Sequence, residues 1–109
     1  MKGRISDYRY KGELQKLDSY IDEYDRPVEG WVRVRDIFFS ELGISANELF
    51  ISAQEKSSVD RRIALRYEPL LMIDRSLYHI KIGELSYQIE RVYTDLPNER
   101  MELSLSYVR

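Results

Sequence analysis

Apolar and polar residues alternate along most of the second half of the chain, which is the pattern of half-buried β-strands. The segment RMELSLSYV is the most regular example. Met101, Leu103, Leu105 and Tyr107 are expected to face inward, and the residues between them outward. The same two-residue period runs through RRIALRY, LYHIKI and LSYQIERVY. The predicted core consists of the inward positions of these strands: Ile63, Leu65, Ile80, Ile82, Tyr87, Ile89, Leu103 and Leu105.

Turn residues separate these predicted strands. Gly83-Glu84 fits a two-residue hairpin with glycine first, as a type II′ turn prefers. Pro69 excludes a central strand in the loop 68–76. Leu96-Pro97-Asn98 predicts a further turn before the last strand. The connections are therefore mostly short and hairpin-like.

The first half of the chain has one clear strand and one ambiguous segment. In 31–39, WVRVRDIFF, two sets of residues alternate. One face carries Val32, Val34 and Phe38, and the other carries Trp31, Ile37 and Phe39. Residues 13–21, ELQKLDSYI, have both helical spacing and β-prone residues, so the pattern leaves helix and strand open.

A short helix is predicted at residues 46–57. Ser45 and Glu48 match a capping box, in which the serine caps the helix and the glutamate lies at its third position. Ile44 and Ile51 lie off the apolar face of this helix. We expect both isoleucines to become buried only when subunits associate, with Glu48 in the same interface.

These elements predict a mainly β protein: a small β-barrel of about six strands with one short helix in a loop. The chain has 109 residues, enough for a single domain. We assign residues 13–109 to the barrel and residues 1–12, which are rich in lysine and arginine, to a mobile basic arm.

Candidate catalytic and metal-binding residues are few. The chain has no cysteine and one histidine, His79, which the strand pattern places on the surface. The carboxylates of Asp18, Asp22, Glu23 and Asp25 crowd one connection, but their spacing fits no EF-hand loop, so solvated turn residues are expected. No phosphate-binding glycine loop or nucleophile motif occurs. We therefore predict no cofactor, no metal and no enzymatic activity.

Charge and hydropathy restrict the partners. The net charge of −2 lacks the basic excess of a dedicated DNA-binding domain. No apolar run has the length of a membrane span or a signal peptide, so a soluble protein without a membrane partner is expected. Arginines of two predicted strands, together with Trp31 and Tyr67, could form the basic and aromatic surface of a single-strand nucleic-acid binder. An outer barrel face or an interface with neighbouring acids is the favoured interpretation of these residues: Arg33, Arg35, Arg61, Arg62 and Arg66.

The segment DEYDRPVEGWVRV resembles a signature of phage head–tail adaptor, or head-closure, proteins. That family tends to carry Asp/Glu-Tyr-Gly-x-Pro-Val-x-x-Trp in a hairpin after its first strand. Tyr24, Pro27, Val28 and Trp31 match this pattern, while Asp25 stands where glycine is usual. Aspartate can occupy a left-handed turn position at some cost in free energy.

The remaining segments resemble the family in their order. SELGISANELFISAQ is similar to the link between strand and helix, and DRRIALRY to a strand H-x-I-x-x-R-Y with Arg61 where histidine is common. The stretch from LYHIKI to LSLSYV is similar to the closing strands. The basic arm is longer than in the family.

The resemblance implies a β-barrel subunit of a virion ring of about twelve copies. Such a ring closes the DNA-filled head and offers the docking surface for the tail. The implied partners are other copies of the chain, the portal-side adaptor, the tail terminator protein and packaged DNA, which passes without sequence-specific binding. Before assembly the protein would lie in the host cytoplasm. The alternative from the residues is a small OB-like barrel that binds single-stranded nucleic acid; a hydrolase has no support in the sequence.

Overall fold

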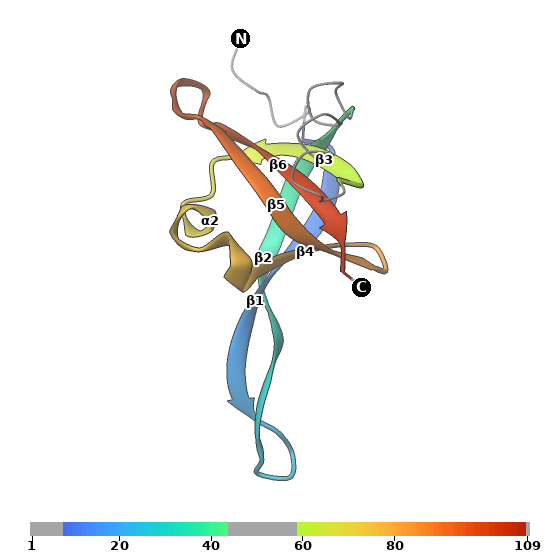
Figure 1. Ribbon diagram of the computed structural model, residues 1–109, viewed down its shortest axis with the longest axis vertical. Helices are drawn as coiled ribbons and strands as arrows, with labels where there is room; N and C mark the ends of the chain where they lie inside the picture. The colour runs from blue at the N-terminus through green and yellow to red at the C-terminus, as the bar shows by residue number, and fades with distance from the viewer. Residues whose placement is uncertain (1–7, 44–58, 109) are drawn as a thin grey trace.

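The computed structural model describes residues 8–43 and 59–108, which form a closed antiparallel β-barrel (Figure 1). The strand order around the barrel is β1-β2-β3-β6-β5-β4. The strands are β1 (Tyr10–Ile21), β2 (Pro27–Leu42), β3 (Arg61–Arg66), β4 (Tyr78–Ile82), β5 (Leu85–Asp95) and β6 (Arg100–Tyr107). The prediction of a small, mainly β barrel is confirmed.

The core is built from the inward positions of all six strands. Seven of the eight predicted core residues are buried, and Ile82, which is half-buried, packs against the cluster. The first two strands add Leu14, Ile37 and Phe39 to the core. Because the barrel is closed, residues distant in sequence share one interior: Leu14 of β1 pairs with Ile80 of β4.

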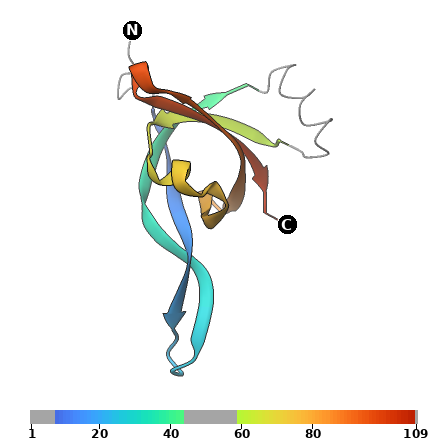
Figure 2. The same cartoon turned by 60° about the vertical axis from the view of Figure 1, so that its left-hand side comes forward.

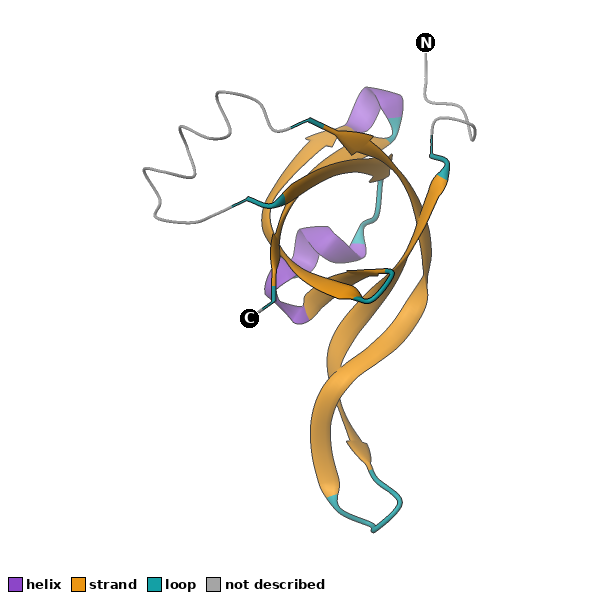
Figure 3. Cartoon of the chain, turned by 90° about the vertical axis from the view of Figure 1, so that its right-hand side faces the viewer, coloured by secondary structure: helices purple, strands orange, loops and turns teal. Residues whose placement is uncertain are grey.

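Two short helical segments cover one end of the barrel. They are α2 (Leu70–Ile73) and the 3-10 turn η2 (Arg75–Leu77), and Leu71 of α2 joins the core. Figure 3, which looks into the ring of strands, shows this segment behind the opening. The prediction from Pro69 that no strand crosses 68–76 is confirmed.

Arg61 lies at the opposite end of the barrel, where β3 begins. Its guanidinium donates hydrogen bonds to the Glu41 carboxylate and the Tyr87 hydroxyl, and it lies over the rings of Phe39 and Tyr87. Burial disfavours its charged form, but the hydrogen bonds to Glu41 and Tyr87 outweigh this effect and raise the pKa of Arg61.

Burial at the C-terminal end of β6 does not follow the predicted alternation. Ser104 and Ser106 were expected outside and are buried, whereas Tyr107 was expected inside and is 40% exposed. Tyr107 still pairs with the buried Tyr87, and their ring centroids lie 5.1 Å apart, so it shares the face of Tyr87. The register shift at Ile89/Arg91 leaves Glu90 of β5 without a cross-strand partner on β6. The Ser106 hydroxyl is buried against Glu90, to whose carboxylate it donates a 2.6 Å hydrogen bond.

The first two strands are longer than predicted. β1 begins at Tyr10, so Tyr10–Gly12 belong to the barrel and not to an arm, and Tyr8 is also buried. Residues 13–21, left open by the pattern, are strand. β2 begins at Pro27, where a turn was expected, because its first residues pair with the end of β1. The remaining part of the arm, residues 1–7, and the predicted helix 46–57 lie outside the described residues.

Two turns have the backbone that their sequences predict. Asp25 has φ +58°, so it occupies the left-handed position where glycine is usual. Gly83 has φ +62° at the first position of the β4–β5 hairpin. Within the described part of the chain, no helix is long and apolar enough to cross a membrane.

Candidate functional site

The most distinctive feature is a two-stranded ribbon that projects from the barrel (Figures 1 and 2). The backbone of β1 pairs with β4 only at Glu13–Lys16, and that of β2 pairs with β3 only at Phe39–Leu42. Residues 17–33 of these strands and their turn have no paired strand besides each other. We call residues 17–33 the ribbon; it makes the molecule 50 Å long but only 26 Å thick.

Large apolar side chains on the ribbon are exposed. Tyr24 at the turn is 70% exposed and Ile21 is 63% exposed. Tyr20, Trp31 and Val32 are also exposed, at 49%, 37% and 39%. A two-stranded ribbon has little independent stability in water, so such a surface is typical of an element that a partner covers.

The tip of the ribbon is held by Asp22. One oxygen of its carboxylate accepts hydrogen bonds from the backbone N–H groups of Tyr24 and Arg26, both at 2.9 Å. The other oxygen accepts from Arg26 Nε at 3.0 Å. The backbone hydrogen bond from Arg26 is the main cause that lowers the pKa of Asp22. The tip is therefore an ordered turn.

Tyr20 and Gly30 pack against each other across the ribbon. A Cβ on Gly30 would lie 3.2 Å from the Tyr20 ring, so the glycine leaves room for the ring to lie flat on the neighbouring strand. Further towards the barrel, the rings of Trp31 and His79 stack with centroids 3.4 Å apart and planes 13° apart. Burial lowers the pKa of His79. The histidine that was expected on the surface is thus half-covered at the base of the ribbon.

The ribbon is strongly acidic. It contains two cations, Arg26 and Arg33, and Arg33 binds carboxylates outside the ribbon. Five carboxylates lie on it: Asp18, Asp22, Glu23, Asp25 and Glu29. The Arg26 guanidinium binds Asp22 at 2.9 Å and lies 5.1 Å from the centre of the Tyr24 ring. Of the described residues, no group of three or more histidines and carboxylates is placed to hold a metal ion.

A second feature lies where β2 leaves β3. Their ladder ends at Phe39↔Leu65, and Tyr67 turns away to bond the Glu99 carbonyl through its N–H. We call the resulting opening between β2 and the end of β3 the strand gap. It contains a hollow of about 490 Å³, lined by Tyr8, Arg35, Asp36, Ile37, Phe38, Leu65, Arg66, Tyr67 and Glu68.

An ion pair spans the strand gap. Arg35 on β2 binds the carboxylate of Glu68, whose side chain is 5% exposed. A second oxygen of that carboxylate accepts a hydrogen bond from the Leu70 N–H at 3.4 Å. Because a buried carboxylate without a partner is costly, this pair fixes the two walls of the gap relative to each other.

The arginines that the nucleic-acid alternative would place in one stripe do not form one surface. Arg33 and Arg35 lie on β2 beyond the ladder with β3. Arg33 binds Asp36 at 3.0 Å and Glu13 at 3.5 Å.

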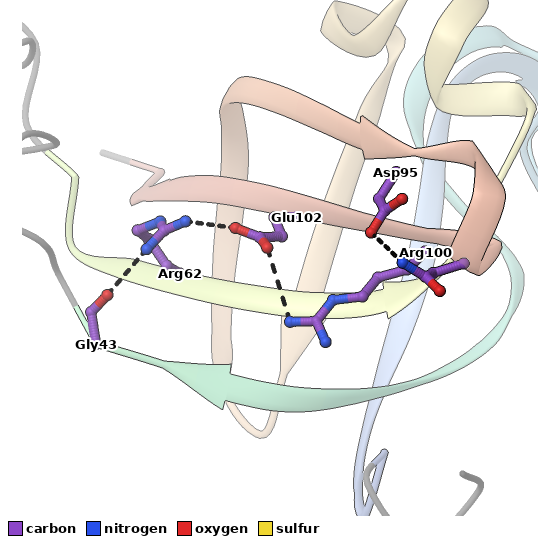
Figure 4. Close-up of polar contacts among 6 residues, drawn as sticks. Gly43, Arg62, Asp95, Arg100 and Glu102 are labelled. Atoms are coloured by element: carbon purple, nitrogen blue, oxygen red, sulfur yellow. Dashed lines mark hydrogen bonds and ion pairs between the residues drawn. The ribbon is translucent and has the colours of Figure 1, made fainter. Parts of the chain in front are cut away.

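Arg62, at the other end of β3, also binds groups of this chain. It binds Glu102 at 2.6 Å and donates to the Gly43 carbonyl at 3.1 Å, as Figure 4 shows. Arg66 is exposed, and no ion pair joins it to another residue in the described ranges.

Sequence reasoning found part of this site. The four family-like hairpin residues, Tyr24, Pro27, Val28 and Trp31, all lie on the ribbon. Ile44, Glu48 and Ile51 lie outside the described residues. The strand gap was missed, although Phe38, an aromatic residue off the core face, was a visible signal. The burial of Glu68 had no signal in the sequence.

Comparisons with known proteins identify the fold. No protein-family profile matches the chain, and no curated protein matches it. Among solved structures, the chain is similar to protein SF1141 from Shigella flexneri 2a, a structural-genomics target solved in solution. The TM-score is 0.68 at 21% sequence identity, over 96% of each chain. This likeness defines a shared small β-barrel architecture.

Proposed function

We propose that this protein is a phage or prophage assembly protein, a subunit of the head–tail connector ring that closes the DNA-filled head and receives the tail. The observation that carries the proposal is the ribbon. It is an ordered, acidic projection with exposed Tyr20, Ile21 and Tyr24, and the barrel leaves it uncovered. Such an element fits an assembly role, in which neighbouring subunits supply the missing cover.

The sequence supports the same proposal. The residues that resemble the head-closure signature coincide with the ribbon, and Asp25 has the left-handed backbone that the signature glycine would have. The net negative charge of the chain also suits a channel through which DNA passes without adhering. The proposed partners are further copies of the chain, the portal-side adaptor and the tail terminator protein, and the proposal includes no catalytic reaction.

The alternative, a single-strand nucleic-acid-binding barrel, has weaker support. It needs arginines free to follow a phosphate backbone beside stacked aromatic rings. Arg33, Arg35 and Arg62 instead bind carboxylates of this chain. Trp31 already stacks on His79 and lies on the acidic ribbon.

Electron microscopy tests the assembly role. The protein is added to DNA-filled, tailless heads of the phage or prophage that encodes it. We expect ring-shaped density below the portal and increased retention of DNA. Unchanged heads would contradict the proposal.

A binding assay separates the two functions. Fluorescence anisotropy with a labelled single-stranded oligonucleotide is measured over a range of salt concentrations. We expect no salt-dependent binding at micromolar protein. Binding that weakens steeply with salt would favour the nucleic-acid alternative.

A further inference from the structure

We propose that the tip of the ribbon of one subunit docks into the strand gap of the next copy of the chain. This contact rests on the proposed ring and identifies the surfaces that would build it. The tip consists of residues 20–28, around Tyr24. The receiving surface is the hollow between β2 and the end of β3, with the arginines at its rim.

The hollow has the chemistry of a receptor for an aromatic group. Phe38, Leu65 and Tyr67 contribute apolar wall, and Phe38 is 56% exposed there. Side chains of this kind bind an aromatic ring through large contact area and offset or edge-to-face packing. The Arg35–Glu68 pair fixes the two walls relative to each other, so the receptor is formed before a partner arrives.

One cation at the rim of the hollow, Arg66, has no carboxylate partner among the described residues, whereas Arg35 is paired with Glu68. Arg66 of β3 is directly opposite Arg100 of β6 in the barrel ladder, and like charges at paired positions are unfavourable. Glu102, 3.7 Å from Arg100, is shared with Arg62, as Figure 4 shows. Glu102 is therefore already shared by two arginines that do not line the hollow, and Arg66 keeps its positive charge without a carboxylate partner in the described part of the chain. An acidic partner would relieve the repulsion.

The ribbon tip is complementary to this surface. Tyr24 is the most exposed of its apolar side chains, and Glu23 and Asp25 flank it with exposed carboxylates. An aromatic ring between two acids matches an apolar hollow beside Arg66, whose charge has no ion-pair partner among the described residues. The tip also needs little ordering on binding, because Asp22 already fixes its turn.

The proposed ring uses the two surfaces head-to-tail, so that each copy donates its tip to one neighbour and receives the tip of another. The tip lies at the end of the ribbon, whereas the hollow lies on the barrel wall, so each copy donates one surface and receives with the other. Head-to-tail contacts of this kind repeat from copy to copy and close into a ring when the rotation between neighbours allows it. Each subunit would then cover the ribbon of one neighbour.

Disulfide trapping tests the contact in the full chain, which has no native cysteine. Tyr24→Cys and Phe38→Cys variants are mixed at high concentration under mild oxidation, and also with DNA-filled heads. We expect a cross-link between the two variants, and a ladder of multimers from the double variant. Tyr93→Cys, at a position 65% exposed on β5, replaces Phe38→Cys as the matched control.

A charge exchange provides the second measurement. Glu23→Arg in the Tyr24→Cys chain, or Arg66→Glu in the Phe38→Cys chain, should each reduce the cross-linking about five- to ten-fold. Both changes together should restore it. Circular dichroism checks that each variant remains folded.

The outcomes are distinct. Cross-links only between Tyr24→Cys chains, equal cross-linking with the Tyr93→Cys control, or no rescue by charge exchange would overturn this contact. A ring on the heads without the Tyr24–Phe38 cross-link would overturn the contact while the proposed function stands. Cross-linked multimers without density on the heads would support the contact and contradict the proposed function.

Discussion

Leu103 of β6 and Tyr93 of β5 lie close together on neighbouring strands, but one is buried and the other is exposed. Leu103 is completely buried and pairs with Val92 across the ladder, whereas Tyr93, the next residue on β5, is 65% exposed. We expect Leu103→Ala to lower the free energy of unfolding by about 2–5 kcal/mol, because it leaves a cavity in the barrel. Tyr93→Ala should change it by less than about 0.5 kcal/mol. Urea denaturation measures both, and a Leu103→Ala value within error of wild type would contradict the described core.

His79 makes stability depend on pH. Burial lowers the pKa of His79 in the folded protein below the ordinary histidine value of 6.5. The imidazole therefore binds a proton more readily in the unfolded chain than in the folded one. The contribution of neutral His79 is present above pH 6.5 and is lost as the pH falls through the lower, folded-state pKa. His79→Phe should keep the stack on Trp31 and reduce this pH dependence. Thermal unfolding followed by Trp31 fluorescence tests it, and identical pH profiles for the two proteins would show that another group titrates.

At the scale of elements, the sequence predicted strands where alternation and turn residues agree. Positions such as Leu103 follow directly from a two-residue period. The burial of Ala64 and Ser104 did not follow from that period. In a small closed barrel, residues on the outward face are also covered by neighbouring strands. The length of β1 and β2 was missed because the ribbon has no buried face, so hydrophobic alternation cannot mark it.

The candidate site was predictable only where a local motif marked it. The hairpin signature located Tyr24 and Trp31, and it predicted the left-handed position of Asp25. The strand gap depends on where β2 separates from β3 and on Glu68 meeting Arg35, residues 33 positions apart in the sequence. Periodicity carries no information on such a contact.

The ribbon turn should respond to a single substitution. Asp22→Ala removes the acceptor for the N–H groups of Tyr24 and Arg26. We expect faster amide hydrogen exchange at residues 22–28 and unchanged exchange in β3 and β6. Asp18→Ala is the matched control, because Asp18 bonds only the adjacent Ser19 N–H among the contacts described for it. Equal exchange in the two variants would mean that the Asp22 side chain does not hold the tip.

At the scale of the whole molecule, the isolated protein is expected to be monomeric or weakly associated at micromolar concentration. Charged residues make up 33% of the chain, and the acidic ribbons repel one another until each meets its receptor. A head-to-tail contact between one turn and one hollow buries little surface. A template such as the DNA-filled head, which aligns many copies, would therefore favour closure of the ring. Sedimentation velocity tests this expectation. A stable ring of pure protein at low concentration would contradict it.

The continuity of the ribbon with the barrel has a mechanical consequence. β1 and β2 run from the tip into the barrel wall as unbroken strands, and the register shift at Leu14/Gln15 lies only where the ribbon joins the barrel. A pull on the tip along its long axis therefore loads the hydrogen bonds of the wall in shear, many at once, instead of opening them one after another. The projection acts as a stiff tether. A force that a neighbouring subunit applies to the tip would therefore be transmitted directly to the wall of the barrel.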